Sequence, residues 1–310
     1  MIDFKELVKA GVHFGHQASR WVPKMDPYIW GVKNKVHLID VSKTAHQLEK
    51  ASLFLQEVAA QGKQILWVGT KKPARAIVKQ AAITFDMPYV DYRWIGGTLS
   101  NYGQVKKSVT RLLHFEDVIS KSESYPNYTK KELNSIRKNA DRLEAIVGGI
   151  KTLKWPLGAI VIVDVNREQS ALKEAASVGL PIVALVDTNA DPSLVDYVIP
   201  ANDDAPRSIG VIIDYLKQAV EKGVQKKAAQ KDAAQQAQKK VEAAPEKAVK
   251  AEPKKKEVSV AKKEAAPAKP AAKAAKKEVA PKAKAEEAPK KAPRKATESK
   301  PEKSAEKKAE

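Results

Sequence analysis

The chain has 310 residues and carries 56 Lys and Arg against 37 Asp and Glu, a formal net charge of +19. It contains no cysteine, which excludes disulfides, cysteine-based zinc sites and thiol nucleophiles. No apolar run is long enough to predict a membrane span, and the first residues lack the pattern of a secretory signal. We therefore expect a cytoplasmic protein with polyanionic partners.

Composition changes near residue 224. Residues 224–310 hold 26 basic and 13 acidic residues and contain no aromatic residue, Gly, Leu or Ile. Such a segment cannot bury a core, so we predict a disordered basic tail rich in Lys, Ala, Glu and Pro over 224–310. Two roles stay open for it: binding nucleic acid through charge alone, or acting as a solubilising spacer.

An aromatic and basic stretch covers residues 12–35. Its prolines and glycines exclude a long helix, and we expect an irregular, functional loop. His13 and His16 lie close in sequence, but no third ligand is near, so structural histidines are favoured over a metal site. The candidate nucleic-acid contacts in this stretch are Arg20, Trp21, Lys24, Lys33 and Lys35.

Short apolar runs alternate with amphipathic helical patterns over most of the first 223 residues. The runs predict strands at 36–39, 65–68, 89–91, 159–164 and 182–187, with a short further strand at 198–199. Strands that alternate with helices predict an α/β fold with a doubly wound parallel sheet of about five strands.

A different pattern interrupts this alternation over residues 104–147. Two apolar stripes with spacings of three and four predict an inserted α-helical hairpin with a coiled-coil seam. Thr129 and Glu132 predict a capping box for its second helix. Residues 1–103 and 148–223 then form the α/β domain. Lys106 and Lys107 on the hairpin are candidate RNA contacts, and a merely solvated charged face is the alternative.

Residues 69–75 combine a strand end, a glycine turn and a helix start, an arrangement that binds phosphate. Lys71, Lys72 and Arg75 supply the cations. Since the glycine fingerprints of NTPases and dinucleotide sites are missing, backbone phosphate of a nucleic acid is favoured over a free nucleotide. Solvated lysines at a helix start are the alternative.

Residues 89–103 connect the predicted sheet to the hairpin. Arg93 is expected to contact RNA phosphate, and Trp94 to pack against the root of the hairpin. Gly96 and Gly97 permit the turn between them. Asn101, at the end of the stretch, is a further candidate RNA contact.

Five aspartates near predicted strand ends and helix starts invite a magnesium site. Strand-end, turn and N-cap roles are favoured instead, because the Asp side chain bonds local N–H groups. We therefore expect no metal ion and no cofactor. These residues are Asp187, Asp191, Asp196, Asp203 and Asp204.

Seven segments together resemble the bacterial small-subunit ribosomal protein S-two family, in order and over roughly residues 1–222. They are LVKAGVHFGH (7–16), WVPKMDPYI (21–29), IDVSKT (39–44), GTKK (69–72), RWIGGTLSN (93–101), DTNADP (187–192) and IPANDDAPRSI (199–209).

The resemblance implies a flavodoxin-like α/β domain with a protruding coiled coil. It also implies a structural, non-enzymatic protein of the small subunit that contacts rRNA and neighbouring proteins and helps hold protein S-one. Two features depart from the family pattern. Ala190 stands where members often have Cys, and the tail after about residue 224 is longer than in typical members.

Two other classes of function stay as alternatives. One is a nucleotide-dependent enzyme on the same fold, since fold does not fix function. Against it stand the missing glycine fingerprints and the lack of a recognisable His/Ser or His/Asp set. The other is a protein that coats nucleic acid nonspecifically through its tail. The structural role in the small subunit, by contrast, implies neither a membrane partner nor a small-molecule substrate.

Overall fold

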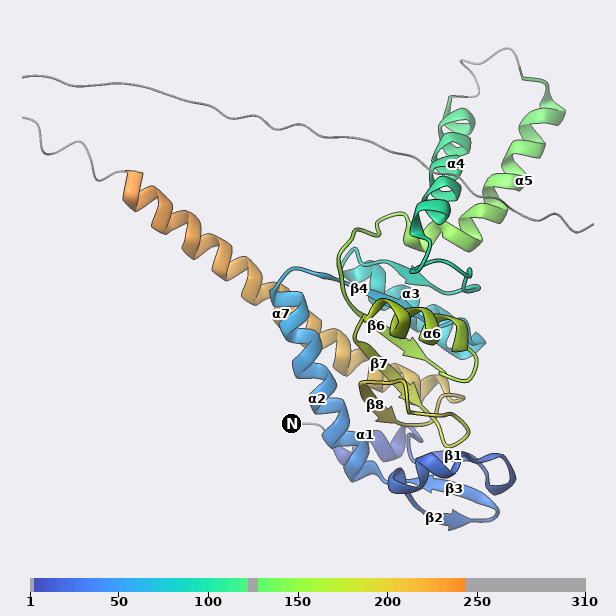
Figure 1. The fold of residues 1–310 in the computed structure, drawn as a ribbon, viewed down its shortest axis with the longest axis vertical. Coiled ribbons are helices and arrows are strands. Elements are labelled where there is room, and N and C mark those ends of the chain that lie inside the picture. The colour runs from blue at the N-terminus through green and yellow to red at the C-terminus, as the bar shows by residue number, and fades with distance from the viewer. Residues whose placement is uncertain (1–2, 122–127, 243–310) are drawn as a thin grey trace, which may run out of the picture. The chain divides into compact units, whose positions relative to one another are not determined.

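The computed structural model describes residues 3–121 and 128–242. At its centre lies a five-stranded parallel sheet in the order β5-β4-β6-β7-β8 (Figure 1). Numbered along the chain, this order is 2-1-3-4-5, that of flavodoxin-like doubly wound folds, so the predicted fold class is confirmed. The strands are β4 (Gln64–Val68), β5 (Tyr89–Val90), β6 (Leu157–Val163), β7 (Ile182–Val186) and β8 (Tyr197–Pro200).

Two apolar cores lie on opposite faces of this sheet because successive strand side chains point to opposite sides. In β4, Ile65 and Trp67 enter one core, while Leu66 and Val68 enter the other. The first core is covered by α1 (Phe4–Lys9), α2 (Val41–Ala60), α3 (Lys72–Thr84) and α7 (Pro206–Glu242), and the second by α6 (Gln169–Val178) and the helical hairpin. All side chains of β6 are buried, as a sheet covered on both faces requires.

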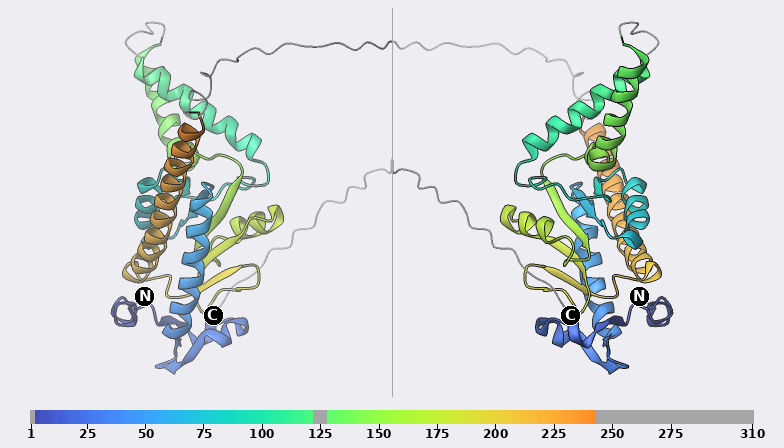
Figure 2. Two further views of the ribbon diagram at one scale, coloured as in Figure 1. Left: turned by 90° about the vertical axis from the view of Figure 1, so that its left-hand side faces the viewer. Right: turned by 90° about the vertical axis from the view of Figure 1, so that its right-hand side faces the viewer.

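Helices α2 and α7 run side by side over the first core (Figures 1 and 2). Gly223 permits their close approach, since a Cβ at that position would lie 2.4 Å from the carbonyl oxygen of Gln56. Because α7 follows β8 directly in the chain, its start lies near the carboxyl end of β8, where polar residues gather.

The N-terminal region corrects two predictions. Residues 12–35 are not irregular, and residues 36–39 do not join the parallel sheet. Instead β1 (Phe14–Gln17), β2 (Ile29–Lys33) and β3 (Val36–Ile39) form a separate antiparallel sheet, with short 3-10 turns at Ala18–Arg20 and Pro23–Tyr28. Asn34 and Lys35 connect β2 and β3 with φ of 52° and 64°. Such a two-residue turn usually contains glycine at its second position. Because lysine stands there instead, the sequence did not indicate a hairpin.

The predicted helical hairpin is α4 (Tyr102–Ser120) followed by α5 (Lys130–Val147). The capping box of Thr129 and Glu132 is confirmed. Val105, Val109 and Leu112 are buried in the seam as expected, whereas Glu116 leaves it and pairs with Lys151 at 2.6 Å. A coiled-coil geometry stays a prediction, and most of the expected turn at 122–128 lies outside the described residues.

The last helix continues past the expected domain boundary at Val224 and ends at Glu242. Disorder from residue 224 is therefore wrong for 224–242. That segment is rich in Ala, Lys and Gln and lacks Pro and Gly, and the first proline of the tail is Pro245, so helix-forming residues prevail there. The rest of the predicted tail, 243–310, lies outside the described residues. Among the described helices, α7 included, none has the length and apolar character to cross a membrane.

Candidate nucleic-acid interface

Polar side chains meet where the parallel strands end. Lys71 follows β4, and its ammonium lies 2.7 Å from an oxygen of Asp203 and 2.6 Å from one of Asp204, both just after β8. It also lies 3.3 Å from Asp164, which follows β6. Lys71 was predicted to contact RNA phosphate, but here it balances three carboxylates of its own chain. Asp164 had no sequence signal beyond its place at a strand end.

Burial and pairing shift the pKa values of this cluster. Burial acts to lower the pKa of Lys71, but hydrogen bonds to Asp203 and Asp204 raise it overall, so the ammonium stays charged. Burial raises the pKa of Asp203 to about 7, with further effects from nearby Asp164 and Asp187, although Lys71 opposes the shift. The Asp203 carboxyl group therefore keeps its proton to a higher pH than an exposed carboxyl group does.

His16 ties the N-terminal antiparallel sheet to this edge. Its Nδ1 lies 3.0 Å from Asp187 and its Nε2 3.3 Å from Asp204, while its backbone N–H donates to the Thr188 hydroxyl at 2.9 Å. The hydrogen bond to Asp187 raises the pKa of His16, although burial opposes it. Gly15 permits this contact, because a Cβ there would lie 2.7 Å from the Thr188 methyl.

Part of this cluster has the side chains of a metal site. His16, Asp203 and Asp204 offer ligand atoms that all lie within 4.8 Å of one another, and imidazole and carboxylate groups bind divalent ions. In this structure Lys71 bonds the same two aspartates. The sequence-based expectations treated His16 and the two aspartates as parts of separate candidate groups. The expectation of no metal stays a prediction.

The other two aspartates bond groups of their own chain, and Asp191 has the expected local role because it accepts a hydrogen bond from the backbone N–H of Ser193 at 2.9 Å. Asp196 accepts a hydrogen bond from the backbone N–H of Ile182 at 2.8 Å. Asp191 pairs with Lys24 at 2.7 Å, which lowers the pKa of Asp191 to about 2.

Glu174 on α6 holds the stretch that connects the sheet to the hairpin. Its carboxylate accepts hydrogen bonds from the Trp94 indole N–H at 3.1 Å and the Gly97 backbone N–H at 2.8 Å. It also accepts from the backbone N–H groups of Leu99 and Ser100. Burial acts to raise the pKa of Glu174, but these hydrogen bonds lower it overall. No pattern in the sequence indicates this role.

The predicted residues between Arg93 and Gly97 differ in how far they are buried. Trp94 is 8% exposed and belongs to the core that includes the hairpin. Gly97 has a φ of 91°, a conformation that favours glycine. Gly96 has no neighbour within 4 Å of an added Cβ. Arg93 is exposed.

The candidate contacts of the N-terminal sheet are mostly at the surface. Arg20, Lys24, Lys33 and Lys35 are exposed. The Trp21 ring is partly buried and lies 5.2 Å from the His37 ring, centre to centre. Trp30 on β2 is 76% exposed and was not predicted as a contact. Its place in an aromatic-basic stretch was the only signal that could have identified it.

The remaining candidates lie at two other places. Lys72 is exposed at the first residue of α3, while Arg75 one turn later is partly buried. Asn101, Lys106 and Lys107 are exposed at the start of the hairpin. The predicted contacts thus occupy three parts of the fold: the N-terminal sheet, the start of α3 with Arg93, and the hairpin root.

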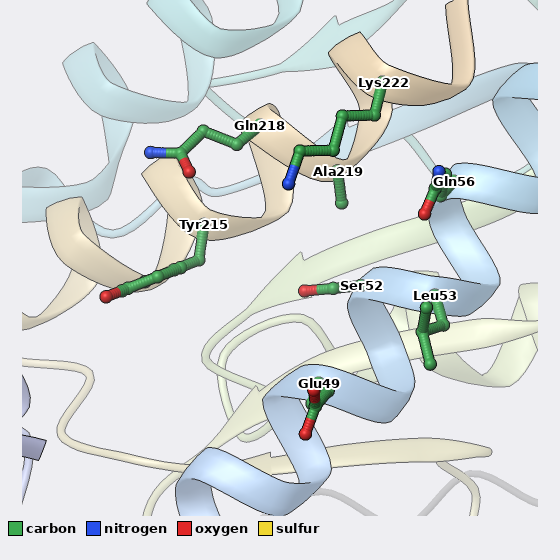
Figure 3. A pocket seen from close by; sticks show the side chains of 8 residues that line it. All are labelled: Glu49, Ser52, Leu53, Gln56, Tyr215, Gln218, Ala219 and Lys222. Atoms are coloured by element: carbon green, nitrogen blue, oxygen red, sulfur yellow. The ribbon is translucent and has the colours of Figure 1, made fainter. Parts of the chain in front are cut away.

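A pocket of about 210 Å³ lies elsewhere, between α2 and α7 (Figure 3). Its lining contains none of the predicted contacts and mixes single charges with neutral side chains. It is lined by Glu49, Ser52, Leu53, Gln56, Tyr215, Gln218, Ala219 and Lys222.

Comparison with known proteins agrees with the resemblance in the sequence. The family model described as Ribosomal protein S2 matches residues 7–223. The chain is 44% identical to small ribosomal subunit protein uS2 of Amoebophilus asiaticus over 76% of this chain and 74% of that protein. It is 41% identical to that of Cytophaga hutchinsonii over 75% and 91%.

A third relative is the uS2 protein of Chlorobium chlorochromatii, which is 45% identical over 67% of this chain and 83% of its own length. The family model covers the sheet, the helical hairpin and the predicted contacts, and it ends at the residue where the predicted α/β domain ends. The chain belongs to the ribosomal protein S2 family, a family of structural, non-enzymatic proteins.

Proposed function

We propose that this chain is a structural constituent of the small ribosomal subunit in the cytoplasm. There it binds small-subunit rRNA and neighbouring ribosomal proteins and supports subunit assembly and translation. The observation that carries the proposal is the family match over residues 7–223, together with relatives that are named as small-subunit proteins. The chain's net charge of +19 suits an RNA partner.

The proposed RNA contacts are the predicted cations outside the carboxylate cluster, together with the Asn101 amide and the Trp21 ring. Side chains of this kind bind phosphate and set the position of a protein on RNA. Lys71 is left out because three carboxylates already surround its ammonium. The set is Arg20, Trp21, Lys24, Lys33, Lys35, Lys72, Arg75, Arg93, Asn101, Lys106 and Lys107, with Trp30 added for its exposed ring.

We also propose that the chain helps attach protein S-one. This step rests on the resemblance alone. Both helices of the hairpin carry exposed Lys and Arg, which suit contacts with RNA.

The enzyme alternative makes a different prediction. A structural protein should bind ATP or NAD weakly, because the glycine loops that hold such ligands are missing from the sequence. Isothermal titration of the purified full-length chain with each nucleotide tests this. Saturable binding in the micromolar range would contradict the structural role. A chain that coats RNA nonspecifically would instead bind free RNA and small-subunit particles equally well.

A further inference from the structure

A cleft of about 540 Å³ opens at the carboxyl ends of three neighbouring strands. Its lining follows β4, β5 and β6, which are adjacent in the sheet. The chain order reverses between β4 and β6, and doubly wound folds bind ligands at that point. The lining residues are Thr70, Arg75, Tyr92, Arg93, Trp94, Arg167, Glu168 and Ser170.

Thr70 fixes two of the three arginines of the cleft. Arg75 Nε donates to the Thr70 carbonyl oxygen and Arg167 Nε to the Thr70 hydroxyl, each at 2.9 Å. The same hydroxyl donates to Glu168. Each guanidinium thus uses its inner nitrogen for the protein, which leaves its two terminal nitrogens to bind a ligand. Two guanidinium groups held in this way can each donate two hydrogen bonds to the oxygens of a phosphate group.

The cleft is lined by three arginines and one carboxyl group. Within residues 3–121 and 128–242, no carboxylate oxygen lies within 4.0 Å of the Arg75, Arg93 or Arg167 guanidinium. The one carboxyl group in the lining, that of Glu168, is 3% exposed. Burial raises its pKa overall, although hydrogen bonds from Thr70 and the charge of Arg167 oppose the shift. The cleft therefore attracts an anion.

An exposed aromatic ring stands beside these cations. Tyr92 is 51% exposed, and the Arg75 guanidinium carbon lies 5.4 Å from its ring centre. Unpaired RNA bases stack on such rings and on guanidinium planes. Arg93, next in sequence, is exposed and has no ion-pair partner in the described part of the chain.

We propose that this cleft binds a single unpaired nucleotide of RNA. Its phosphodiester lies among Arg75, Arg93 and Arg167, and its base stacks on Tyr92. The volume of the cleft falls within the range of small-ligand sites. The proposal rests on the proposed rRNA-binding function and adds Tyr92 and Arg167 as contacts. A free nucleotide offers the same phosphate and base, so the experiment separates the two sources.

The test measures binding of the full-length chain to a short single-stranded RNA of mixed sequence by fluorescence anisotropy over a salt series. Arg93→Gln, alone and with Arg167→Gln, should weaken binding, the double variant by roughly tenfold. Each change should also lower the salt slope by about 1, because it removes one cation that neutralises a phosphate. Glu168→Gln, which removes the one carboxyl group of the lining, should leave binding unchanged or stronger.

Matched changes at two exposed lysines on α2 and α7, Lys50→Gln with Lys222→Gln, serve as the control and should have little effect. Melting temperatures establish that each variant is folded. Arg93→Gln keeps the test valid if removal of the Arg167 guanidinium unfolds the chain. Crosslinking with ultraviolet light should attach the RNA to the peptide that contains Tyr92.

Folded arginine variants that bind RNA like the wild type would overturn the proposal, while wild-type binding to small-subunit particles would leave the proposed function intact. Displacement of the RNA by micromolar AMP, or by inorganic phosphate, would also overturn it and assign the cleft to a free ligand. Failure of the wild type to bind particles at all would count against the proposed function itself.

Discussion

Single polar side chains hold together the parts of this fold that lie nearest the proposed contacts. Glu174 is one of them, because its carboxylate bonds the turn that joins the sheet to the hairpin. Removing it leaves backbone N–H groups of that turn without an acceptor. An unsatisfied donor of this kind costs more free energy than an ordinary surface hydrogen bond contributes.

We predict that Glu174→Ala lowers the free energy of unfolding by about 1–3 kcal/mol, as expected when partly buried donors lose their acceptor. Urea denaturation measures the change. The matched control is Glu221→Ala, an exposed residue of α7, which should stay within about 0.5 kcal/mol of the wild type. Equal effects of the two changes would show that Glu174 is only a surface residue.

The His16 cluster predicts a pH-dependent stability. The pKa of His16 is raised from 6.5 and that of Asp203 from 3.8 to about 7. The folded chain therefore keeps protons that the unfolded chain releases. The stability from each group is complete below its unfolded pKa and is lost as pH rises through its folded pKa.

We therefore expect the difference in Tm between the wild type and His16→Gln to shrink as pH rises from about 6 to 9. Thermal denaturation at a series of pH values measures it. His114→Gln, at an exposed position on α4, is the control. A Tm difference that is constant or grows with pH would contradict the proton-linked role of His16.

At the scale of elements, tight backbone contacts set where helices and strands meet. Gly149 lies between α5 and β6 in a short 3-10 turn (Gly148–Ile150). A Cβ at Gly149 would lie 2.3 Å from the carbonyl oxygen of Tyr89 in β5, too close for any side chain. This glycine lets the end of the hairpin return against the edge strand.

Gly149→Ala should therefore destabilise the chain by about 1–3 kcal/mol through overpacking. Gly103→Ala is the control, since an added Cβ there meets nothing within 4 Å and alanine favours the helix. Denaturation curves of both variants test the pair. A neutral Gly149→Ala would mean that β5 and the turn move apart at little cost.

The elements that the sequence predicted are those with long, regular patterns. Apolar runs identified β4, β6 and β7, and the capping box at Thr129 identified the start of α5. In the N-terminal sheet the run at 36–39 was predicted as a strand, but β1 and β2 were missed because they lie in a stretch with prolines and glycines and the turn from β2 to β3 uses Asn34 and Lys35 rather than glycine. The pairing of these strands into a separate antiparallel sheet depends on packing against the rest of the fold, which a local pattern does not show.

The site was only partly predictable for a similar reason. The sequence pointed to Lys71 as a phosphate ligand, but carboxylates that follow β6 and β8 reach it across the sheet. Contacts between residues so far apart in sequence follow from topology and not from spacing. The burial of Trp94 was easier to expect, because a large aromatic ring that follows a strand usually enters the core.

At the scale of the whole molecule, charge is divided between the α/β domain and the basic C-terminal segment. The family model ends at residue 223, and residues 224–310 hold 26 of the 56 basic residues. Sequence-independent attraction to RNA scales with the number of phosphates neutralised. Under the proposed function, the segment would therefore add to binding on any RNA, while the domain would provide the contacts specific to the subunit.

We predict that truncation after Gly223 leaves incorporation into small-subunit particles intact and reduces the salt slope for binding free RNA. Gradient sedimentation and anisotropy measure the two effects. Since α7 extends to Glu242, a second truncation after Glu242 separates its helical part from the rest. Failure of either variant to incorporate would show that the segment docks specifically.

The most direct test of the central claim is sedimentation of the full-length chain with small-subunit particles that lack this protein, over a range of salt concentrations. The proposed role predicts saturable binding of one chain per particle, which persists at moderate salt and weakens steadily as salt rises. Absence of binding, or binding without a stoichiometric limit, would contradict it.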